Sequence, residues 1–390
     1  MIIKPKARGF ICTTAHPKGC EESVRRQIEY VKKKGSMDGA KKVLILGAST
    51  GYGLASRIAA AFGCGAATLG VMFEKEATER RTATPGYYNT KAFEKFAKAE
   101  GLYAKSINGD AFSKEIKAQV IETIKKDLGK VDMIVYSLAT PRRTAPDGVT
   151  YSSVLKTVGE PFVNKNIDVT KREVTEASIS PATEEEIAAT IKVMGGEDWG
   201  DWLDALVKAD VVSENALTFA YSYIGSDLTF PIYRDGSIGQ AKKHLYQTAD
   251  EITKKYADKN IRGFVSINKA LVTQASAAIP VVPLYVTILY KIMKEKGLHE
   301  GCIEQIDRLF RDKLPAGPEV DENGFIRIDD YEMREDVQKE VKEVWDKIET
   351  ENVEQYADID GYWEDFFHMF GFNYDNVDYE EAVSYTHLRA

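Results

Sequence analysis

Short apolar runs alternate with amphipathic segments through the first third of the chain. Residues 43–46 are all apolar and predict a buried strand, and residues 54–62 predict the helix that follows it. Three further runs predict strands at 67–73, 102–107 and 131–136. Apolar residues at helical spacing predict a helix across 113–128. This regular alternation is typical of a parallel sheet with helices on both faces.

The pattern loosens in the middle of the chain, where turn residues are frequent. Within this stretch Thr183 and Glu186 form a capping-box signature, which predicts a helix over 184–194. Two more strands are predicted at 217–224 and 263–267, and the last third of the chain is mostly helical and charged. We therefore expect an insertion, rather than a separate domain, between the two sets of strands.

Three glycines, Gly47, Gly51 and Gly53, follow the first strand and lead into its helix. Backbone N–H groups point outward at such a turn, the helix dipole favours negative charge, and the missing Cβ atoms let a pyrophosphate approach. The spacing is Gly-x-x-x-Gly-x-Gly rather than Gly-x-Gly-x-x-Gly. This variant resembles the short-chain dehydrogenase/reductase superfamily, and it predicts a dinucleotide site.

Candidate cofactor-binding residues follow the next three strands. Glu74 ends the second strand, where a carboxylate can accept both ribose hydroxyls of an adenosine and repel a 2′-phosphate, which favours NADH over NADPH. Asp110 could bond the adenine with Ala111 packing beside it, and Leu138 and Ala139 would line the path toward the nicotinamide. The alternative interpretations are a solvated acid for Glu74 and loop packing for the others.

Composition narrows the class of protein. The net charge of -8 argues against a general binder of nucleic acid or anionic membranes, because either would need a basic face. Four cysteines among 390 residues favour a reducing cytoplasm, and their spacing lacks the C-x-x-C pairs of a zinc site, so we expect no metal. The N-terminus shows no apolar leader, and the most apolar window, 277–292, is too short to span a bilayer.

A tyrosine and a lysine follow the fifth strand, where short-chain reductases usually carry Tyr-x-x-x-Lys. The chemistry needs a phenol that donates to a developing enolate or alkoxide, and a nearby ammonium, with the positive nicotinamide, would lower its pKa from about 10. Here the spacing is Tyr-x8-Lys, with Tyr233 and Lys242. Surface packing is the alternative for this pair. Two pairs fit the usual letters but not the usual place, and we interpret them as coincidence: Tyr290 with Lys294, and Tyr30 with Lys34.

With these motifs together, the chain resembles the NADH-dependent, short-chain dehydrogenase-like trans-2-enoyl-CoA reductase family, also known as FabV-type enoyl-acyl-carrier-protein reductases. The resemblance covers nearly the whole length. Besides the glycine loop and the Tyr-x8-Lys pair, it rests on segments 16–20, 108–112, 193–199, 271–273, 279–285 and 293–297. Residues 384–390 depart from the family pattern and look unrelated to it.

The resemblance implies a role for each matching residue. Tyr233 would be the proton donor, Lys242 would bind the nicotinamide ribose and tune Tyr233, and Tyr223 would hold the thioester carbonyl. An apolar wall covering the acyl chain would include Ile279, Pro280, Pro283 and Leu284, although a helix start packed in the core is also consistent with them. NADH would be lined by Gly47, Ala48, Ser49, Thr50, Gly51, Tyr52, Phe73, Glu74, Asp110, Ala111, Leu138, Ala139, Lys242, Leu271, Val272 and Thr273.

We therefore expect an α/β fold: a Rossmann-type doubly wound parallel sheet with helical additions around the substrate pocket, forming one elaborated domain over 1–390. Its expected parts are the main dinucleotide-binding half (41–140), an insertion (141–216), a catalytic half with the pocket wall (217–285), a helical region (286–383) and the unmatched tail (384–390).

The expected activity is NADH-dependent reduction of the double bond of trans-2-enoyl thioesters in fatty acid metabolism. Hydride would reach the β-carbon, and Tyr223 and Tyr233 would stabilise the enolate oxygen. Two alternatives stay open: a short-chain ketoreductase, which would want Tyr-x-x-x-Lys and an upstream serine, and a non-catalytic NADH sensor, which would need neither Tyr233 nor Lys242. The expected partner is a thioester on CoA or acyl-carrier protein, with no nucleic acid and no membrane, and the resemblance implies a monomer. The sequence leaves the carrier and the acyl length open.

Overall fold

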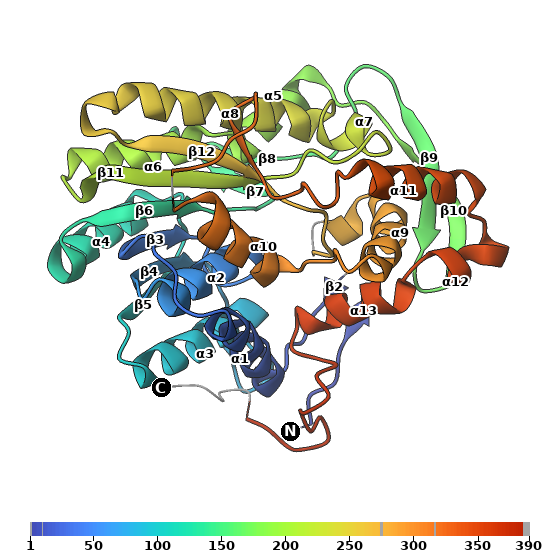
Figure 1. Cartoon of the computed structure of the whole chain (residues 1–390), viewed down its shortest axis with the longest axis horizontal. Coiled ribbons are helices and arrows are strands. Elements are labelled where there is room, and N and C mark those ends of the chain that lie inside the picture. Colours follow the sequence, from blue (N-terminus) through green and yellow to red (C-terminus); the bar gives the residue numbers. More distant parts are fainter. Residues whose placement is uncertain (1, 10, 274–275, 316, 385–390) are drawn as a thin grey trace.

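Seven parallel strands form the centre of the molecule, in the order β13-β12-β11-β6-β3-β4-β5 (Figure 1). The structure is a computed structural model that describes residues 2–9, 11–273, 276–315 and 317–384. The strands are β3 (Lys42–Leu46), β4 (Ala67–Met72), β5 (Ala104–Asn108), β6 (Val131–Tyr136), β11 (Val212–Ser222), β12 (Arg262–Ile267) and β13 (Phe325–Arg327). This is the order of a dinucleotide-binding sheet extended by one strand, which confirms the expected doubly wound α/β fold.

Helices cover both faces of the sheet (Figure 1). The α-helices of the described residues are α1 (Pro17–Lys33), α2 (Gly51–Ile58), α3 (Pro85–Ala99), α4 (Lys114–Thr123), α5 (Glu184–Met194), α6 (Glu197–Lys208), α7 (Phe230–Tyr233), α8 (Ser237–Lys255), α9 (Val282–Glu295), α10 (Cys302–Arg308), α11 (Glu335–Lys347), α12 (Val353–Tyr356) and α13 (Ile359–His368). Both α2 and α4 continue for one π-helical turn each, over Ala59–Gly63 and Ile124–Leu128. In the described parts of the chain, no helix is both long and apolar enough to cross a membrane.

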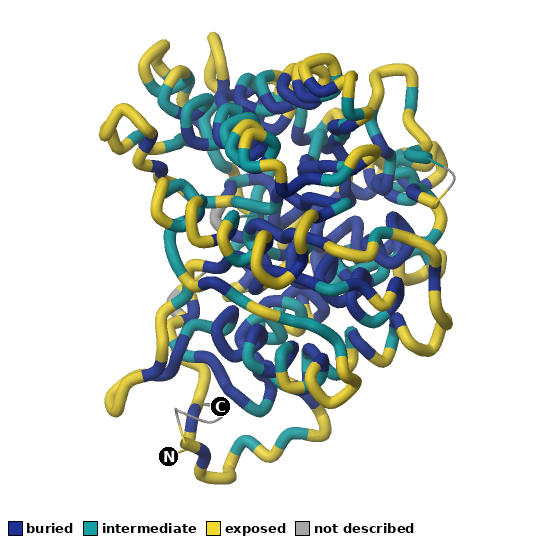
Figure 2. Tube along the Cα trace, turned by 90° about the vertical axis from the view of Figure 1, so that its left-hand side faces the viewer, coloured by how far each residue is buried: buried dark blue, intermediate teal, exposed yellow. Residues whose placement is uncertain are grey.

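The four apolar residues of β3 divide between the two faces of the sheet. Val43 and Ile45 pack with α1, α2, α3 and α10, whereas Leu44 and Leu46 pack with α4, α6 and α8. All four side chains are fully buried. A strand covered on both faces reads as a continuous apolar run, which is why the sequence predicted it so directly. Figure 2 shows this buried interior as dark blue through the middle of the trace.

The insertion contains more strand than the sequence predicted. Two antiparallel hairpins form there: β7 (Arg142–Thr144) with β8 (Thr150–Ser152), and β9 (Phe162–Asp168) with β10 (Glu173–Ile179). The expected helix is present as α5, and its capping box is complete, since Thr183 and Glu186 each accept a hydrogen bond from the other's backbone N–H. Strand β11 begins at Val212, before the predicted residue 217, and β13 was not predicted.

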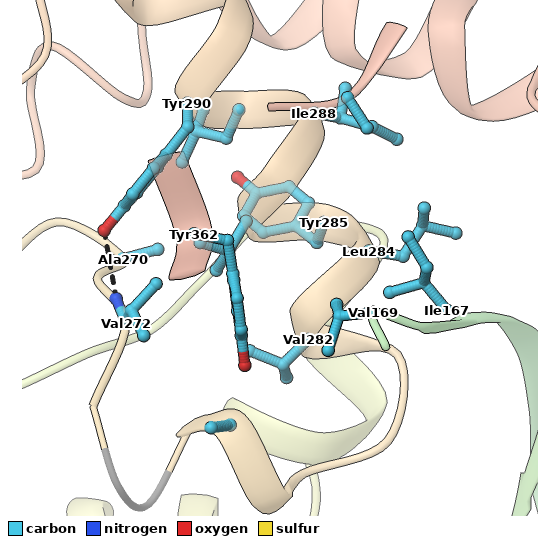
Figure 3. Packing of buried hydrophobic residues seen from close by; sticks show 14 of the residues in the cluster. Ile167, Val169, Ala270, Val272, Val282, Leu284, Tyr285, Ile288, Tyr290 and Tyr362 are labelled. Atoms are coloured by element: carbon cyan, nitrogen blue, oxygen red, sulfur yellow. Dashed lines mark hydrogen bonds between the residues drawn. The ribbon is translucent and has the colours of Figure 1, made fainter. Parts of the chain in front are cut away.

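A second apolar cluster surrounds α9 (Figure 3). Hairpin β9–β10 and helices α11 and α13 pack around this helix, and its residues Leu284, Tyr285 and Ile288 are fully buried. These are helical additions of the expected kind, and they close one end of the sheet.

The beginning of α1 packs tightly against the chain that follows α13. The His16 N–H donates to the Phe370 carbonyl at 2.8 Å. A Cβ on Gly19 would overlap the Gly371 carbonyl, so only glycine fits there. The start of α1 and the segment after α13 are therefore joined by backbone-to-backbone contact. Two short strands, β1 (Ala7–Arg8) and β2 (Ile11–Cys12), precede this contact.

Candidate active site

The predicted site residues gather at one edge of the central sheet. All seven strands are parallel, so their carboxyl ends meet at the same edge, where ligands bind in doubly wound folds. The glycine loop follows β3, Glu74 follows β4, Asp110 follows β5, Leu138 follows β6 and Tyr223 follows β11. Residues 271–273 follow β12. The topology thus brings together residues that lie far apart in the sequence.

The glycine loop makes two contacts that only glycine allows. Gly47 has a φ of +84°, and a Cβ there would lie 2.2 Å from the Ser137 carbonyl oxygen. A Cβ on Gly53 would lie 1.9 Å from the Gly47 carbonyl oxygen. Thr50 is the N-cap of α2, and no side chain in the described ranges caps the first turn of this helix. The exposed backbone N–H groups therefore fit a dinucleotide pyrophosphate.

Glu74 lies beside the glycine loop. Its Oε1 accepts a hydrogen bond from the Ser49 hydroxyl at 2.6 Å, and its Oε2 accepts one from Thr84. The Asn108 side chain bonds both the N–H and the carbonyl of Glu74, at 2.8 and 3.0 Å. These contacts fix the Glu74 side chain beside the glycine loop, where the sequence predicts a ribose-binding acid. The preceding Phe73 is 78% exposed.

The residues after β5 and β6 also border the loop region. Asp110 accepts from the Phe112 N–H at 3.0 Å, which closes the turn after β5. Ala111 is buried, and its carbonyl accepts from the Trp202 indole at 3.1 Å. Leu138 lies against Gly47, and Ala139 is exposed. Asp110 thus has a structural role in its turn whether or not it also bonds the adenine.

Tyr223, Tyr233 and Lys242 form one cluster. The rings of Tyr223 and Tyr233 meet edge to face, with centroids 4.7 Å apart. Lys242, in the second turn of α8, donates to the Tyr223 carbonyl, and its Nζ lies 5.1 Å from the centre of the Tyr233 ring. The Tyr-x8-Lys spacing works because α7 ends at Tyr233, and Gly236 turns the chain before α8 begins.

Burial has the largest effect on the Tyr233 phenol. Tyr233 is 7% exposed, and burial raises its pKa above the usual value of 10. Burial also lowers the pKa of Lys242 to about 7. The Lys242 side chain donates to the Tyr223 backbone carbonyl rather than to Tyr233. Its effect on the Tyr233 pKa is therefore smaller than the effect of burial. Tyr233 is therefore a fully protonated phenol at neutral pH.

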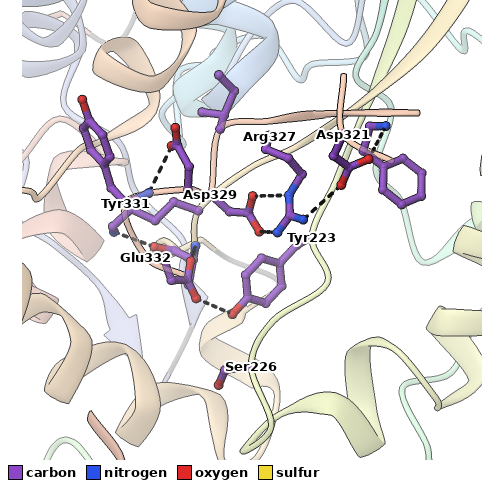
Figure 4. Close-up of polar contacts among 12 residues, drawn as sticks. Tyr223, Ser226, Asp321, Arg327, Asp329, Tyr331 and Glu332 are labelled. Atoms are coloured by element: carbon purple, nitrogen blue, oxygen red, sulfur yellow. Dashed lines mark hydrogen bonds and ion pairs between the residues drawn. The ribbon is translucent and has the colours of Figure 1, made fainter. Parts of the chain in front are cut away.

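One acid in the cluster was missed by sequence reasoning. Glu332 follows β13 and is completely buried. Its Oε1 accepts from the Tyr223 hydroxyl at 3.0 Å (Figure 4). The same oxygen accepts from the Tyr285 hydroxyl at 2.8 Å, and Oε2 accepts from the Ala270 N–H at 2.7 Å. The sequence signal for strand β13 is weak, because Arg327 interrupts the apolar residues Phe325, Ile326 and Ile328.

The segment after β12 is anchored by its neighbours. The Val272 N–H donates to the Tyr290 hydroxyl at 3.0 Å (Figure 3), and the Tyr52 hydroxyl lies 3.0 Å from the Lys269 carbonyl oxygen. Leu271 and Val272 are buried and Thr273 is half-buried. Tyr290 thus holds the predicted cofactor-lining segment through its hydroxyl. Lys294, the other member of the Tyr-x-x-x-Lys pair at this position, forms an ion pair with Asp358 at 2.7 Å instead.

The predicted apolar wall lies at the start of α9. Ile279 and Leu284 are buried in the second apolar cluster, and Pro283 stands in the first turn of the helix. Val281 has a φ of +74°, which is strained for a branched residue, and its N–H donates to the Asn166 side chain at 3.0 Å. Pro280 is half-buried. The packed helix start is therefore present, and an acyl-binding role for the same residues remains a proposal.

Metal ligands do not gather in the described parts of the chain: no group of three or more His, Cys, Asp or Glu side chains there could hold an ion. Among the four cysteines, Cys12, Cys20 and Cys64 are buried and Cys302 is half-buried, and all four are free thiols.

Three family models match successive parts of the chain. Residues 2–79 match the NAD(P)H binding domain of trans-2-enoyl-CoA reductase, and residues 81–315 match the trans-2-enoyl-CoA reductase catalytic region. Residues 320–383 match a model described as an enoyl reductase FAD binding domain.

The residues of 320–383 do not fit a flavin dinucleotide. This segment carries 21 acidic and five basic side chains, which would repel a diphosphate. A Cβ on Gly361 would overlap Asp358 and Lys294, and one on Gly371 would overlap the backbone of His16 and Cys20, so both glycines are used for packing. Within its described residues, the segment offers one edge strand and three helices but no strand–glycine loop–helix unit.

Full-length relatives and solved structures agree with the first two models. An enoyl-[acyl-carrier-protein] reductase [NADH] of Flavobacterium johnsoniae is 58% identical over 97% of both chains, and a trans-2-enoyl-CoA reductase [NADH] of Ruminiclostridium cellulolyticum is 56% identical over 98% of both. The crystal structure of Treponema denticola trans-2-enoyl-CoA reductase in complex with NAD superposes with a TM-score of 0.95 at 53% identity, covering 98% of both chains. That of Clostridium acetobutulicum in complex with NADH gives 0.96 at 48% identity, covering 100% of this chain and 99% of the other. The resemblance inferred from the motifs is thus confirmed, and this chain belongs to the trans-2-enoyl-CoA reductase family.

Proposed function

We propose that this chain is an NADH-dependent reductase that saturates the carbon–carbon double bond of trans-2-enoyl thioesters carried by CoA or acyl-carrier protein. The observation that carries the proposal is the cluster of Tyr223, Tyr233 and Lys242 at the sheet edge that also bears the glycine loop. Family membership supports the same reaction, because an enoyl-acyl-carrier-protein reductase and a trans-2-enoyl-CoA reductase are each more than half identical to this chain over nearly its whole length.

The cofactor is NADH, and the chain's own residues suit it. The backbone of 47–52 and the first turn of α2 would hold the pyrophosphate. Glu74 would accept the ribose hydroxyls, with Ser49 and Thr84 keeping its carboxylate in place. Residues 271–273 and Lys242 would line the nicotinamide end. When bound, NADH supplies the hydride that reaches the β-carbon of the substrate.

The two tyrosines would act on the thioester oxygen. Negative charge develops there as the enolate forms, and donors aimed at that oxygen stabilise the transition state. Tyr233 is suited to donate, since its raised pKa keeps it protonated and no hydrogen bond ties its hydroxyl to another described residue. Lys242 holds the Tyr223 backbone and thereby the spacing between the two rings. Protonation of the α-carbon then completes the reduction.

The finer features remain proposals of ours. We propose a role in fatty acid metabolism, a cytoplasmic location and a monomeric state, each of which follows from the family resemblance and the composition. Ile279, Pro280, Pro283 and Leu284 would form the apolar wall over the acyl chain. An apolar helix start of this kind suits an acyl group, because acyl pockets are themselves mostly apolar.

The experiment is a comparison of Tyr233→Phe with wild type, following the loss of NADH absorbance with crotonyl-CoA. We expect kcat to fall about 10²- to 10³-fold, as when an oxyanion donor is removed, while the Kd for NADH stays within about twofold. Tyr151→Phe, which removes a hydroxyl from the β7–β8 hairpin, is the matched control. Turnover by Tyr233→Phe at the wild-type rate would refute the assignment.

A further inference from the structure

The Glu332 carboxyl joins the carboxyl ends of three strands to α9. It follows β13, and it accepts from Tyr223 after β11, from Ala270 after β12 and from Tyr285 on α9. These contacts are buried, and Glu332 itself is 0% exposed. Burying an acid costs folding free energy unless the acid is well hydrogen-bonded. Because Glu332 lies next to Tyr223, the proposed ligand of the thioester carbonyl, its position indicates a function of this acid in the reaction.

The hydrogens around Glu332 Oε1 can be counted. An ionised carboxylate only accepts, so the hydroxyl hydrogens of Tyr223 and Tyr285 would then both point at this one oxygen. Tyr223 has a single hydrogen and could not also donate it to a thioester oxygen. A neutral carboxyl changes this arrangement, because its own hydrogen can be donated to the Tyr223 oxygen. The Tyr223 hydrogen then becomes available to the substrate.

Burial disfavours the charged form of the Glu332 carboxyl. Burial raises the pKa of Glu332, and Asp329 contributes in the same direction. Lys269 and the donors Ala270 and Tyr285 oppose this shift. The Lys269 ammonium donates to the Ala270 carbonyl at 2.9 Å, and no ion pair within 4.0 Å links it to Glu332 in the described structure. The pKa of Lys269 is itself lowered to about 8 by burial.

Building on the role of Tyr223 proposed above, we propose that Glu332 is a positioning residue for the reduction: its neutral carboxyl donates to the Tyr223 hydroxyl, which in turn donates to the thioester oxygen. No bond to carbon is made or broken by this chain of two hydrogen bonds, and no proton leaves it. The chain only polarises as charge develops on the oxygen, and hydrogen bonds in such a chain strengthen one another.

The Ala270 N–H makes the proposal testable with a single substitution. In Glu332→Gln the amide oxygen must face the Ala270 N–H, because the amide nitrogen has no lone pair to accept it. The two amide hydrogens then face the Tyr223 and Tyr285 oxygens. Glutamine therefore reproduces the donating carboxyl and cannot reproduce the accepting carboxylate. Glu332→Leu removes both.

The experiment measures kcat with crotonyl-CoA and the Kd for NADH in these variants. We expect Glu332→Gln to keep at least about a third of the wild-type kcat and Glu332→Leu to lose at least about tenfold, both with an unchanged Kd for NADH. The exposed Glu335→Gln is the matched control. If glutamine loses as much as leucine, or more than tenfold where the leucine variant does not fold, the proposal is overturned.

A double variant separates this role from a merely structural one. If Glu332 acts through Tyr223, the loss caused by Glu332→Leu should shrink to less than about twofold in a Tyr223→Phe background, because the hydroxyl it positions is gone. An undiminished loss in that background would overturn the proposal. Wild-type turnover by Tyr223→Phe alone would instead refute the role of Tyr223 proposed above, so the two failures are distinguishable.

Discussion

Replacing Gly53 with alanine should disrupt the dinucleotide site, because Gly53 packs against the backbone of the glycine loop. The added Cβ would lie 1.9 Å from the Gly47 carbonyl oxygen and 3.2 Å from the Ser137 hydroxyl. Real Cβ atoms essentially never come closer than 3.0 Å to another heavy atom, so α2 and the loop must separate by about 1.1 Å. The obstacle is backbone, which cannot rotate out of the way.

The expected magnitude follows from that displacement. Overpacking of this kind costs about 1–3 kcal/mol of folding stability. A shift of about 1 Å also moves the N–H groups of the first turn away from the pyrophosphate, and misplacement on this scale can cost roughly a hundredfold in an active site. We therefore expect the Kd for NADH to rise at least about tenfold, measured by fluorescence titration, with urea unfolding run in parallel.

Gly65→Ala supplies the control for this prediction. Gly65 has a φ of +65° and open space around its would-be Cβ, so alanine there brings backbone strain without a clash. It should cost about 1 kcal/mol of stability and leave the Kd for NADH unchanged. If Gly53→Ala binds NADH within twofold of wild type, the close approach of Gly53 to Gly47 is not what shapes the site.

Two further predictions concern charge. Glu74→Ser removes the carboxylate that Ser49 holds beside the loop, and it should shift the ratio of kcat/KM for NADPH over NADH upward by at least about tenfold; an unchanged ratio would leave Glu74 as a solvated acid. Lys242→Met should stabilise the protein below pH 7, where wild type buries a charged ammonium. Because burial lowers the Lys242 pKa from 10.5 to about 7, the unfolded chain holds the extra proton between these values. The free energy of unfolding of the wild type should therefore rise as the pH increases through this range, and the stability difference between Lys242→Met and wild type should become smaller. If urea unfolding shows the same difference between the two proteins from roughly pH 6 to 10, this reasoning is contradicted.

The central strands were predictable because local sequence decides them. Strand β6 and helix α5 have the predicted bounds, since a run buried on both faces and a complete capping box are visible without any knowledge of the partners. Strand β13 was not predicted, because only three of its residues pair with a neighbouring strand, at the edge of the sheet. Hairpin β9–β10 was not predicted, because its residues are mostly polar and the helix that it covers, α9, lies more than a hundred positions away in the chain.

The positions of the candidate site residues were predictable where a motif follows a strand, and not where they depend on packing. The glycine loop, Glu74 and the Tyr-x8-Lys pair could all be placed by counting from strand ends. Glu332 could not, because it meets Tyr223 across 109 positions of sequence. The burial that raises the Tyr233 pKa was also not visible in the sequence, because it depends on packing.

The start of α1 can reach its final place only late in protein synthesis. Gly19 packs against the Gly371 carbonyl, and the His16 N–H donates to Phe370, so both partners are made roughly 350 residues after α1 itself. At about 5–20 residues per second, the ribosome takes on the order of 20–70 s to supply them. Through that interval the beginning of the first helix lacks its closing contact. A chaperone that covers the emerging N-terminus would therefore act longest on this segment, although it lies outside the sheet that defines the fold.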